Sequence, residues 1–457
     1  MRDLSLLQIQ MRDLAGFAVT RYTILTLKPN AKINWLSFAL AKHLTGELRG
    51  AIEVIDAYLH TLTEGSPEKE RGFESSELAL YRNTILSEIP DNYEEALEDL
   101  SGWEGLVVDR AAWLMARATY QLKLGRHEEA SQTFLALFER GSTEDYRVHS
   151  GYMCAILLLD RETCDEAMQL RGTNTVATMM KLSDTQKQTL LGAYRGELLT
   201  MMPRSPAVQR IPLTLMDGDE FRSAVDAYCR KALTKGVPSL CSDLSSLIVV
   251  EENGRYRRVD DPVDVKSNPI YTVFVEIVEQ YIDSLASGAM FSTADEKEEP
   301  PSTLLWVWYL RAGLHELAGE YTEGIEMLNK CLEHTPTAVD VYELKARLLK
   351  AAGDIISAVE CLDLGRDLDK QDRYINNQTT KYMLQAGMEE TALERISLFT
   401  RHEGNPEQNL YDMQCSWYEL ELATCLERKE EWGRSLKKYG ESGRSWGLQV
   451  AKKNHAN

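Results

Sequence analysis

The sequence predicts an all-α protein whose helices pair and stack into a solenoid of repeats, coiled as a right-handed superhelix. The first observation is a period of 34 residues at which similar residue types recur. The second is that no stretch shows the pattern of a parallel sheet. The third is a composition of 44% hydrophobic and 27% charged residues, which is ordinary for a folded soluble protein and too apolar for a disordered one.

The period is clearest in the last third of the chain. Each copy carries an aromatic residue, a small residue, a turn glycine, a second small residue and a bulky apolar residue, in that order. The first copy has Trp308, Ala312, Gly319, Gly324 and Leu328, with Pro336 at its end, the second has Tyr342, Ala346, Gly353, Ala358 and Leu362, and the third keeps Gly387, Ala392 and Ile396. This is the tetratricopeptide pattern.

The spacing within a copy has a physical cause. Ala312 stands where the two helices of a repeat would cross closely, so a larger side chain would push them apart. Gly319 suits the turn, because a residue that ends a helix often adopts the left-handed conformation. Gly324, Leu328 and Cys331 fall on one face of the second helix. A single helix pair cannot bury that face, so neighbouring repeats must stack.

Residues 1–197 are predicted to form earlier repeats of the same kind. The matching positions are Trp35, Ala39, Ala51 and Ile55 in one copy, Ala96 and Leu100 in another, and Gly125, Ala130 and Phe134 in a third. The apolar periodicity predicts helices over Leu4–Leu27, Ile33–Leu44, Arg49–Thr61, Glu74–Ser87, Tyr93–Leu100, Ala111–Lys123, His127–Phe138, Tyr146–Leu158 and Cys164–Arg171.

Residues 198–302 are predicted to be an irregular helical connector. Three prolines between Met201 and Pro212 bar a continuous helix there. Helices are expected over Phe221–Leu233, Val237–Val249 and Pro269–Ala286, with a polar link that contains Arg255, Arg257 and Arg258. The acidic, proline-stopped segment Ala294–Ser302 is expected to be a hinge or a solvated loop.

Regular repeats are predicted for residues 303–439, and an unpatterned tail for residues 440–457. A long connector, His402–Leu410, delays the final repeat, in which Ala423, Trp432 and Ser435 hold the expected offsets.

Charge and cysteine usage exclude several classes of protein. A net charge of -20 argues against a chain-wide nucleic-acid footprint or a polybasic membrane anchor, so no direct DNA partner is expected, although a local basic patch stays open. The sequence lacks the pattern of a signal peptide, and no segment approaches 18 consecutive apolar residues. We therefore expect no membrane association and a cytoplasmic location. The eight scattered cysteines form no C-x-x-C pair, so reduced, packed thiols are expected.

Catalytic and metal motifs are incomplete. Two His-Glu pairs, at 127–128 and 315–316, begin the H-E-x-x-H zinc motif, but Ser131 and Gly319 replace its second histidine, so no metal site is predicted. His315 is expected to be a packed or solvated histidine. Residues 443–447 match G-x-S-x-G, yet Ser445 lies in an aperiodic tail without the strand that a nucleophile elbow needs, which makes coincidence the better interpretation. Trp306 and Trp308 are expected to pack in the core rather than form a ligand box.

Basic residues cluster late in the chain. Arg373, Lys381, Arg401, Lys437 and Lys438 come from successive repeats, whose like elements line one side of a stacked array. Such a set could bind a polyphosphate or an acidic segment of a partner. From the residues alone, a solvated face is the safer interpretation.

Five ordered segments are more selective than the repeat positions. They are Met1–Leu14, Arg210–Leu213, Glu298–Val307, Asp372–Asn376 with Lys381–Leu384, and Met413–Trp417. In order and spacing they resemble the auxiliary subunit of the N-terminal acetyltransferase A complex. The resemblance runs from residue 1 to about Tyr439. The family protein is longer at both ends, so the chain is expected to be a fragment or a truncated form of it.

The resemblance implies a non-catalytic scaffold. Such a subunit wraps the catalytic acetyltransferase subunit, tunes its active site and carries it to ribosomes to acetylate nascent N-termini. A catalytic chain would need an [RQ]-x-x-G-x-[GA] loop for acetyl-coenzyme A, and both Gln169–Asn174 and Arg401–Pro406 fail at its last position. We therefore expect that this chain is no enzyme and has no cofactor of its own, and that acetyl-coenzyme A binds only the catalytic partner.

The resemblance also implies a structural ligand, inositol hexakisphosphate, held by basic residues of the late region. Carried over by motif, the candidates are Arg373, Lys381, Tyr382, Arg401, Lys437 and Lys438. Gln378 and Gln385 stand where family members often have lysines, which makes the expected site weaker or shifted.

Two other functions stay open. One is a general tetratricopeptide-repeat adaptor for protein–protein interaction, such as a receptor for acidic C-terminal peptides, although the Lys, Asn and Arg set for that role is not evident. The other is an enzyme in its own right, for which Ser445 is the only support.

Overall fold

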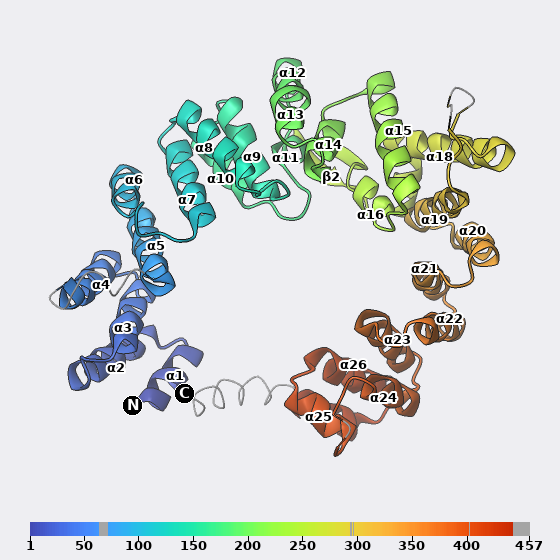
Figure 1. The fold of residues 1–457 in the computed structure, drawn as a ribbon. Coiled ribbons are helices and arrows are strands. Elements are labelled where there is room, and N and C mark those ends of the chain that lie inside the picture. Colours follow the sequence, from blue (N-terminus) through green and yellow to red (C-terminus); the bar gives the residue numbers. More distant parts are fainter. Residues whose placement is uncertain (64–71, 293–294, 296, 402, 442–457) are drawn as a thin grey trace. The chain divides into compact units, whose positions relative to one another are not determined.

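A computed structural model describes residues 1–63, 72–292, 295, 297–401 and 403–441. The described chain is helical apart from one short hairpin, which confirms the all-α expectation (Figure 1). It divides into two compact units. Unit 1 comprises Met1–Met216 with Asn253–Tyr256, and unit 2 comprises Asp217–Glu252 with Arg257–Asn457. The division after Met216 falls inside the segment 198–302 that the sequence marks as irregular.

Unit 1 begins with helix pairs and ends in short, irregular helices. The α-helices are α1 (Arg2–Gln10), α2 (Leu14–Leu27), α3 (Lys32–Leu44), α4 (Leu48–Thr63), α5 (Phe73–Glu88), α6 (Tyr93–Gly102), α7 (Arg110–Lys123), α8 (His127–Glu139), α9 (Tyr146–Ile156), α10 (Arg161–Met168), α11 (Val176–Met179), α12 (Asp184–Ala193), α13 (Leu199–Met201) and α14 (Pro206–Arg210). A π-helical turn, η2 (Tyr194–Leu198), and a 3₁₀ turn, η3 (Ile211–Thr214), complete the unit.

Unit 2 contains the regular repeats. Its helices are α15 (Gly218–Lys235), α16 (Leu240–Ser245), α17 (Pro262–Ser267), α18 (Pro269–Gly288), α19 (Pro301–Leu317), α20 (Tyr321–His334), α21 (Val339–Ala351), α22 (Ile355–Leu368), α23 (Arg373–Gln385), α24 (Glu389–Ser397), α25 (Pro406–Asp412) and α26 (Ser416–Arg428). Residues 432–441 are helical as well. The strands β1 (Val249–Glu252) and β2 (Arg255–Arg258) form a hairpin.

The core confirms the repeat assignment. The small residues Ala312, Ala346 and Ala358 are fully buried, as are the bulky apolar residues Leu328 and Leu362 that follow on the second helices. Helices α19 to α22 succeed one another as adjacent pairs (Figure 1). The equivalent positions of unit 1 are buried to the same degree. They are Ala39, Ala51, Ile55, Ala96, Leu100, Ala130 and Phe134.

Close helix crossing explains the small residues. A Cβ added at Gly324 would lie 2.8 Å from Cδ1 of Leu348 and 3.4 Å from the carbonyl oxygen of Ala312. The turn glycine Gly319 has φ +70°, the left-handed conformation that the pattern predicts.

Trp306 and Trp308 pack as expected. Both are half-buried against the apolar cluster of α19 to α21. The Trp306 ring meets Tyr309 edge to face at 5.6 Å, and the Trp308 ring meets His334 at 6.4 Å.

Two expected helices are wrong in extent. The helix expected over Leu4–Leu27 is two helices, because Arg12 takes φ +58° and Asp13 caps α2 by accepting a hydrogen bond from Gly16 N at 2.9 Å. The helix expected over Val237–Val249 shrinks to α16, and Val249 begins a strand. The polar link that holds Arg255, Arg257 and Arg258 is β2 of the hairpin.

Two expected connectors also differ. Helix α25 begins inside the segment His402–Leu410 and ends two residues after it. Asn405 caps this helix, because its side chain accepts a hydrogen bond from Glu407 N at 2.8 Å. The acidic segment 294–302 is tied to α15 through its described residues: Arg230 pairs with Asp295 at 2.9 Å, and Thr234 donates to Glu299 at 2.8 Å. Of the predicted tail, residues 440 and 441 continue the last helix, and residues 442–457 lie outside the described residues.

Candidate functional site

Three of the candidate residues lie on α23. Arg373 is exposed at its first turn, where its guanidinium lies 5.4 Å from the centre of the Phe399 ring. Lys381 points to α26, with its Nζ 3.3 Å from Oε1 of Glu421. Tyr382 is 8% exposed, and burial raises the pKa of its phenol. It therefore stays protonated at neutral pH.

Neighbouring side chains make direct contacts with these candidate residues. The Lys350 ammonium lies 4.5 Å from the centre of the Tyr382 ring, a cation–π contact. Gln385 donates to the same Glu421 carboxylate that pairs with Lys381, at 3.5 Å. Arg401 is exposed just after α24, and its carbonyl accepts a hydrogen bond from Asn409 Nδ2 at 3.3 Å. The structure thus places Arg373 over Phe399, two residues before Arg401, and directs Lys381 to α26.

Lys437 and Lys438 lie together on the helix 432–441. Lys438 Nζ is 3.2 Å from Oε2 of Glu441 and 3.7 Å from Oε1 of Glu407, and Lys437 Nζ is 3.8 Å from Oε1 of Glu441. They line a cavity of about 430 Å³ with residues of α25 and α26, among them Tyr418. Each lysine is therefore compensated by a carboxylate before any ligand arrives.

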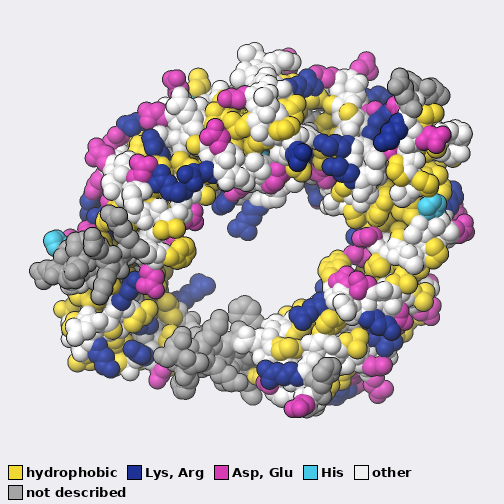
Figure 2. Space-filling view, in the orientation of Figure 1, with side chains coloured by type: hydrophobic (Ala, Val, Ile, Leu, Met, Phe, Trp, Pro, Cys, Tyr) yellow, Lys and Arg dark blue, Asp and Glu magenta, His cyan; other side chains and the backbone are white. Residues whose placement is uncertain are grey.

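Sequence reasoning missed these carboxylates. Glu421, Glu407 and Glu441 sit within ion-pair distance of three of the six candidate residues. Glu407 lies on α25, in the segment expected to be a connector, so offsets between repeats could not reveal its pairing with Lys438. Glu421 lies on α26, and Glu441 lies one turn after the two lysines on their own helix. On the face seen in Figure 2, Lys and Arg side chains of unit 2 accordingly lie among Asp and Glu side chains.

The helix 432–441 also exposes apolar side chains. Trp432 is 62% exposed and Leu436, one turn later, is 74% exposed. Leu420 of α26 is exposed as well. A tryptophan and a leucine one turn apart, beside two lysines, have the composition of a protein-binding surface.

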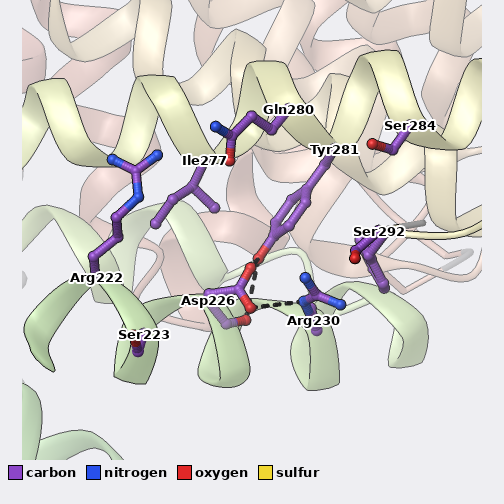
Figure 3. Close-up of a pocket in the computed structure, with 10 residues that line it drawn as sticks. Arg222, Ser223, Asp226, Arg230, Ile277, Gln280, Tyr281, Ser284 and Ser292 are labelled. Atoms are coloured by element: carbon purple, nitrogen blue, oxygen red, sulfur yellow. Dashed lines mark hydrogen bonds and ion pairs between the residues drawn. The ribbon is translucent and has the colours of Figure 1, made fainter. Parts of the chain in front are cut away.

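A polar pocket of about 480 Å³ lies between α15 and α18 (Figure 3). Tyr281 of α18 donates to Oδ1 of Asp226 at 2.5 Å, and Arg230 Nε lies 2.8 Å from the other oxygen of that carboxylate. Burial, followed by the nearby Cys229, raises the pKa of the Tyr281 phenol, so it remains a donor. Arg222 pairs with Glu276. Both arginines of the pocket are thus held by carboxylates, and the arrangement clamps two helices together.

His315 is held by a hydrogen bond within the fold. His315 is 6% exposed and its Nδ1 lies 2.7 Å from Oε2 of Glu320. Burial lowers the pKa of His315, so the packed alternative holds. Within the described residues, no three His, Cys, Asp or Glu side chains gather as a metal site would require. Ser445 lies outside the described part of the chain.

None of the described helices combines the length and the apolar character that a bilayer crossing needs. All eight cysteines are free thiols, and six of them are buried. This agrees with the expectation of reduced, packed cysteines.

Comparison with known families decides the relationship. The family model described as N-terminal acetyltransferase A, auxiliary subunit, matches residues 73–446. The chain belongs to this family. The resemblance found in the sequence is thereby confirmed. Because the family is that of the auxiliary subunit, the chain is classed with the auxiliary subunit and not with the catalytic subunit.

Curated relatives agree with the assignment. The chain is 36% identical over 439 residues to the N-terminal acetyltransferase A complex auxiliary subunit NAA15 of Arabidopsis thaliana. It is 32% identical over 439 residues to N-alpha-acetyltransferase 16, NatA auxiliary subunit, of Homo sapiens. In both cases the match covers 96% of this chain and 45% of the relative. The chain therefore spans a little less than half the length of these relatives.

A solved structure shares the fold. A chain in the structure of Naa15/Naa10 bound to HypK-THB matches 99% of this chain with a TM-score of 0.76 and 30% sequence identity, and 60% of that chain is covered. This confirms the helical-repeat architecture of the auxiliary-subunit family.

Proposed function

We propose that this chain binds the catalytic subunit of an N-terminal acetyltransferase A complex and acts as its scaffold. The observation that carries the proposal is the likeness of fold, over 99% of the chain, to a chain solved in the structure of Naa15/Naa10. Stacked helix pairs support this role, because they present long, preformed surfaces to a partner. The chain itself performs no acetyl transfer.

The helix 432–441 is our candidate for part of the contact. Trp432 and Leu436 are large, exposed and one turn apart, and the basic Lys437 follows directly. Buried aromatic anchors carry much of the binding energy at protein interfaces. A partner that covers both side chains would remove them from water and gain affinity by the hydrophobic effect.

Co-expression tests the proposal. The full chain and the catalytic subunit should copurify at low salt, and the complex should acetylate peptides that begin with Ser or Ala. The double variant Trp432→Ala with Leu436→Ala should weaken the complex at least about tenfold. Val19→Ala with Leu27→Ala removes side chains of similar exposure, 68% and 67%, from unit 1 and should leave it unchanged. Failure of the unmodified pair to copurify would refute the scaffold role.

The proposal extends to the place of action. The family resemblance supports a cytoplasmic complex positioned at the ribosome, where it would meet nascent N-termini exposed by methionine removal. Cosedimentation of the complex with ribosomes should be lost when the chain is omitted. Equal sedimentation of the catalytic subunit alone would contradict this part of the proposal.

We also propose that inositol hexakisphosphate is a structural ligand of the complex, held by Arg373, Lys381, Tyr382, Arg401, Lys437 and Lys438. Ligand phosphates would replace Glu421, Glu407 and Glu441 as partners of the lysines, so binding should weaken steeply with salt. In calorimetry of the complex, Lys437→Ala with Lys438→Ala should weaken binding about tenfold, while Lys330→Ala, an exposed lysine of α20, should not. An equal loss of affinity in both variants would mean that the ligand is held only by nonspecific attraction to lysines, and would contradict this site.

A further inference from the structure

Unit 1 has an apolar groove between α3 and α5. These are the first helices of two neighbouring helix pairs, α3–α4 and α5–α6 (Figure 1). The groove encloses about 550 Å³. Ile33 and Leu36 of α3 line one wall, and Phe73, Leu78 and Tyr81 of α5 line the other. None of its residues is among those on which the function proposed above is argued.

Hydrogen bonds and ion pairs hold the two walls at both ends. Lys32 Nζ lies 2.5 Å from Oε2 of Glu74 at one end. At the other end, His43 Nε2 is 2.7 Å from Oε2 of Glu88, and its Nδ1 is 2.9 Å from the hydroxyl of Tyr81. Because α3 is tied to α5 at these two points, the groove keeps its width without an occupant. A preformed groove spares the occupant the ordering cost of opening it.

The apolar wall continues along α3 beyond the groove. Ile33, Leu40 and Leu44 are 60%, 39% and 41% exposed, and Leu36 lies half-buried between them. Their offsets of 0, 3, 7 and 11 residues form one stripe, about 16 Å long. This is the spacing with which one helix packs against another, so the stripe fits an amphipathic helix of about three turns.

The charges at the rim of the groove indicate which kind of helix would bind there. Glu77 is exposed on the rim, one turn from Phe73 and one turn from Tyr81, and it makes no ion pair with any described residue. Lys32, the cation that lines the groove, is already paired with Glu74. With a net charge of -20, two copies of the chain repel each other, so a second copy is disfavoured as the occupant. A helix with Lys or Arg beside its apolar stripe satisfies Glu77.

We propose that the α3–α5 groove of unit 1 binds a basic amphipathic helix of a partner protein. The apolar stripe of the partner packs on Ile33, Leu36 and Phe73, and a Lys or Arg side chain meets Glu77. The apolar stripe sets the position of the partner helix along the groove, and Glu77 requires a positive charge on that helix.

A model peptide tests the chemistry. The probe is a fluorescein-labelled helical peptide of about 14 residues, with leucines at the spacing of the α3 stripe and arginines beside them. A sister peptide has glutamates in place of the arginines. Fluorescence anisotropy with the full chain should show saturable binding of the basic peptide, weakened by salt, and much weaker binding of the acidic one.

Matched variants locate the site. Ile33→Glu should weaken the basic peptide about tenfold or more, and Leu40→Glu should weaken it in the same direction. Leu364→Glu changes a residue of the same 60% exposure on α22 and should have no effect. Glu77→Lys should weaken the basic peptide about threefold to fivefold and strengthen the acidic one, whereas Glu326→Lys, which alters net charge equally on α20, should do neither.

Four outcomes would overturn the proposal: no saturable binding, equal binding of both peptides, insensitivity to Ile33→Glu, or equal loss in the Leu364→Glu control. Sedimentation of the peptide-free chain gives a fifth. A dimer that Ile33→Glu abolishes would assign the groove to a second copy instead. Failure of the catalytic subunit to copurify would leave this result untouched, because the peptide experiment does not involve it.

Discussion

Replacing Gly151 by alanine should destabilise unit 1 through a single contact. Gly151 is buried in α9, and a Cβ built there would lie 2.2 Å from Cζ, 2.6 Å from Cε1 and 2.9 Å from Cε2 of Phe134. Phe134 is 0% exposed in α8, so its ring has no free space to enter. Overpacking of this kind costs about 3 kcal/mol, and alanine's better helix propensity returns about 1 kcal/mol. The net loss of unfolding free energy should be about 2 kcal/mol.

The contact can be removed from the other side. All three atoms nearest the added Cβ belong to the far side of the Phe134 ring, which leucine lacks, and leucine occupies the equivalent position 100 of an earlier repeat. Phe134→Leu alone should cost about 1.5 kcal/mol. The double variant should cost only about 0.5 kcal/mol, because the clash disappears while the helix propensity gain stays. The coupling between the two sites is then about 3 kcal/mol.

Urea unfolding followed by circular dichroism at pH 7 measures these differences, and thermal unfolding should show Gly151→Ala about 4–8 °C below the unmodified chain. Gly192→Ala is the control, because that exposed glycine of α12 has no atom within 4 Å of an added Cβ. It should be neutral or stabilise by up to about 1 kcal/mol. If Gly151→Ala behaves like Gly192→Ala, or if the two changes at 151 and 134 simply add, the packing argument is refuted.

Two further predictions concern buried polar groups. His149 is 0% exposed, its Nε2 donates to the Thr143 carbonyl at 2.9 Å, and burial lowers its pKa. As the pH falls, the unfolded chain therefore binds a proton at this residue before the folded chain does, and the free energy of unfolding should fall below about pH 6.5. Urea midpoints between pH 7 and 5 check this, and an unchanged dependence of the midpoint on pH in His149→Gln would contradict it. Asp363→Ala should cost about 2 kcal/mol in urea unfolding, because Asp363 pairs with Arg395 and with Arg366, whose side chain is 4% exposed and would keep only its pair with Asp367, 53% exposed. Arg434→Ala, 56% exposed, should cost less than about 1 kcal/mol. Equal costs would contradict the burial argument.

Much of the fold could be predicted because each repeat is decided locally. Ala312 and Ala346 had to be small and Leu328 had to be bulky wherever the helices cross, and these three residues are buried as the spacing required. Misplaced elements have local causes that periodicity does not register. Asn253-Gly254 is such a case: both residues have positive φ, 55° and 76°, which makes the tight turn of the β1–β2 hairpin. The Asn253-Gly254 dipeptide is the sequence feature that could have predicted this hairpin.

The candidate site was less predictable than the fold. Motif likeness named Lys381, Lys437 and Lys438, yet it gave no hint that Glu421, Glu407 and Glu441 compensate them. Helix α25 is short and sits between the repeats, so the carboxylate that it brings to Lys438 obeys no period. The groove between α3 and α5 was missed for a related reason, since it is formed by faces of two different repeats.

The sequence by itself determined that this protein is a stack of helix pairs and which family it belongs to. The helix pairs follow from spacing along the chain, because the small residue at a helix crossing and the glycine in a turn are requirements within one repeat. The family follows from the five ordered segments, which are more selective than the repeat positions. The tertiary structure alone decided which charges meet, which histidines are buried neutral, and where apolar side chains are left uncovered. Those properties depend on side chains from separate helices, and only packing sets the distances between them.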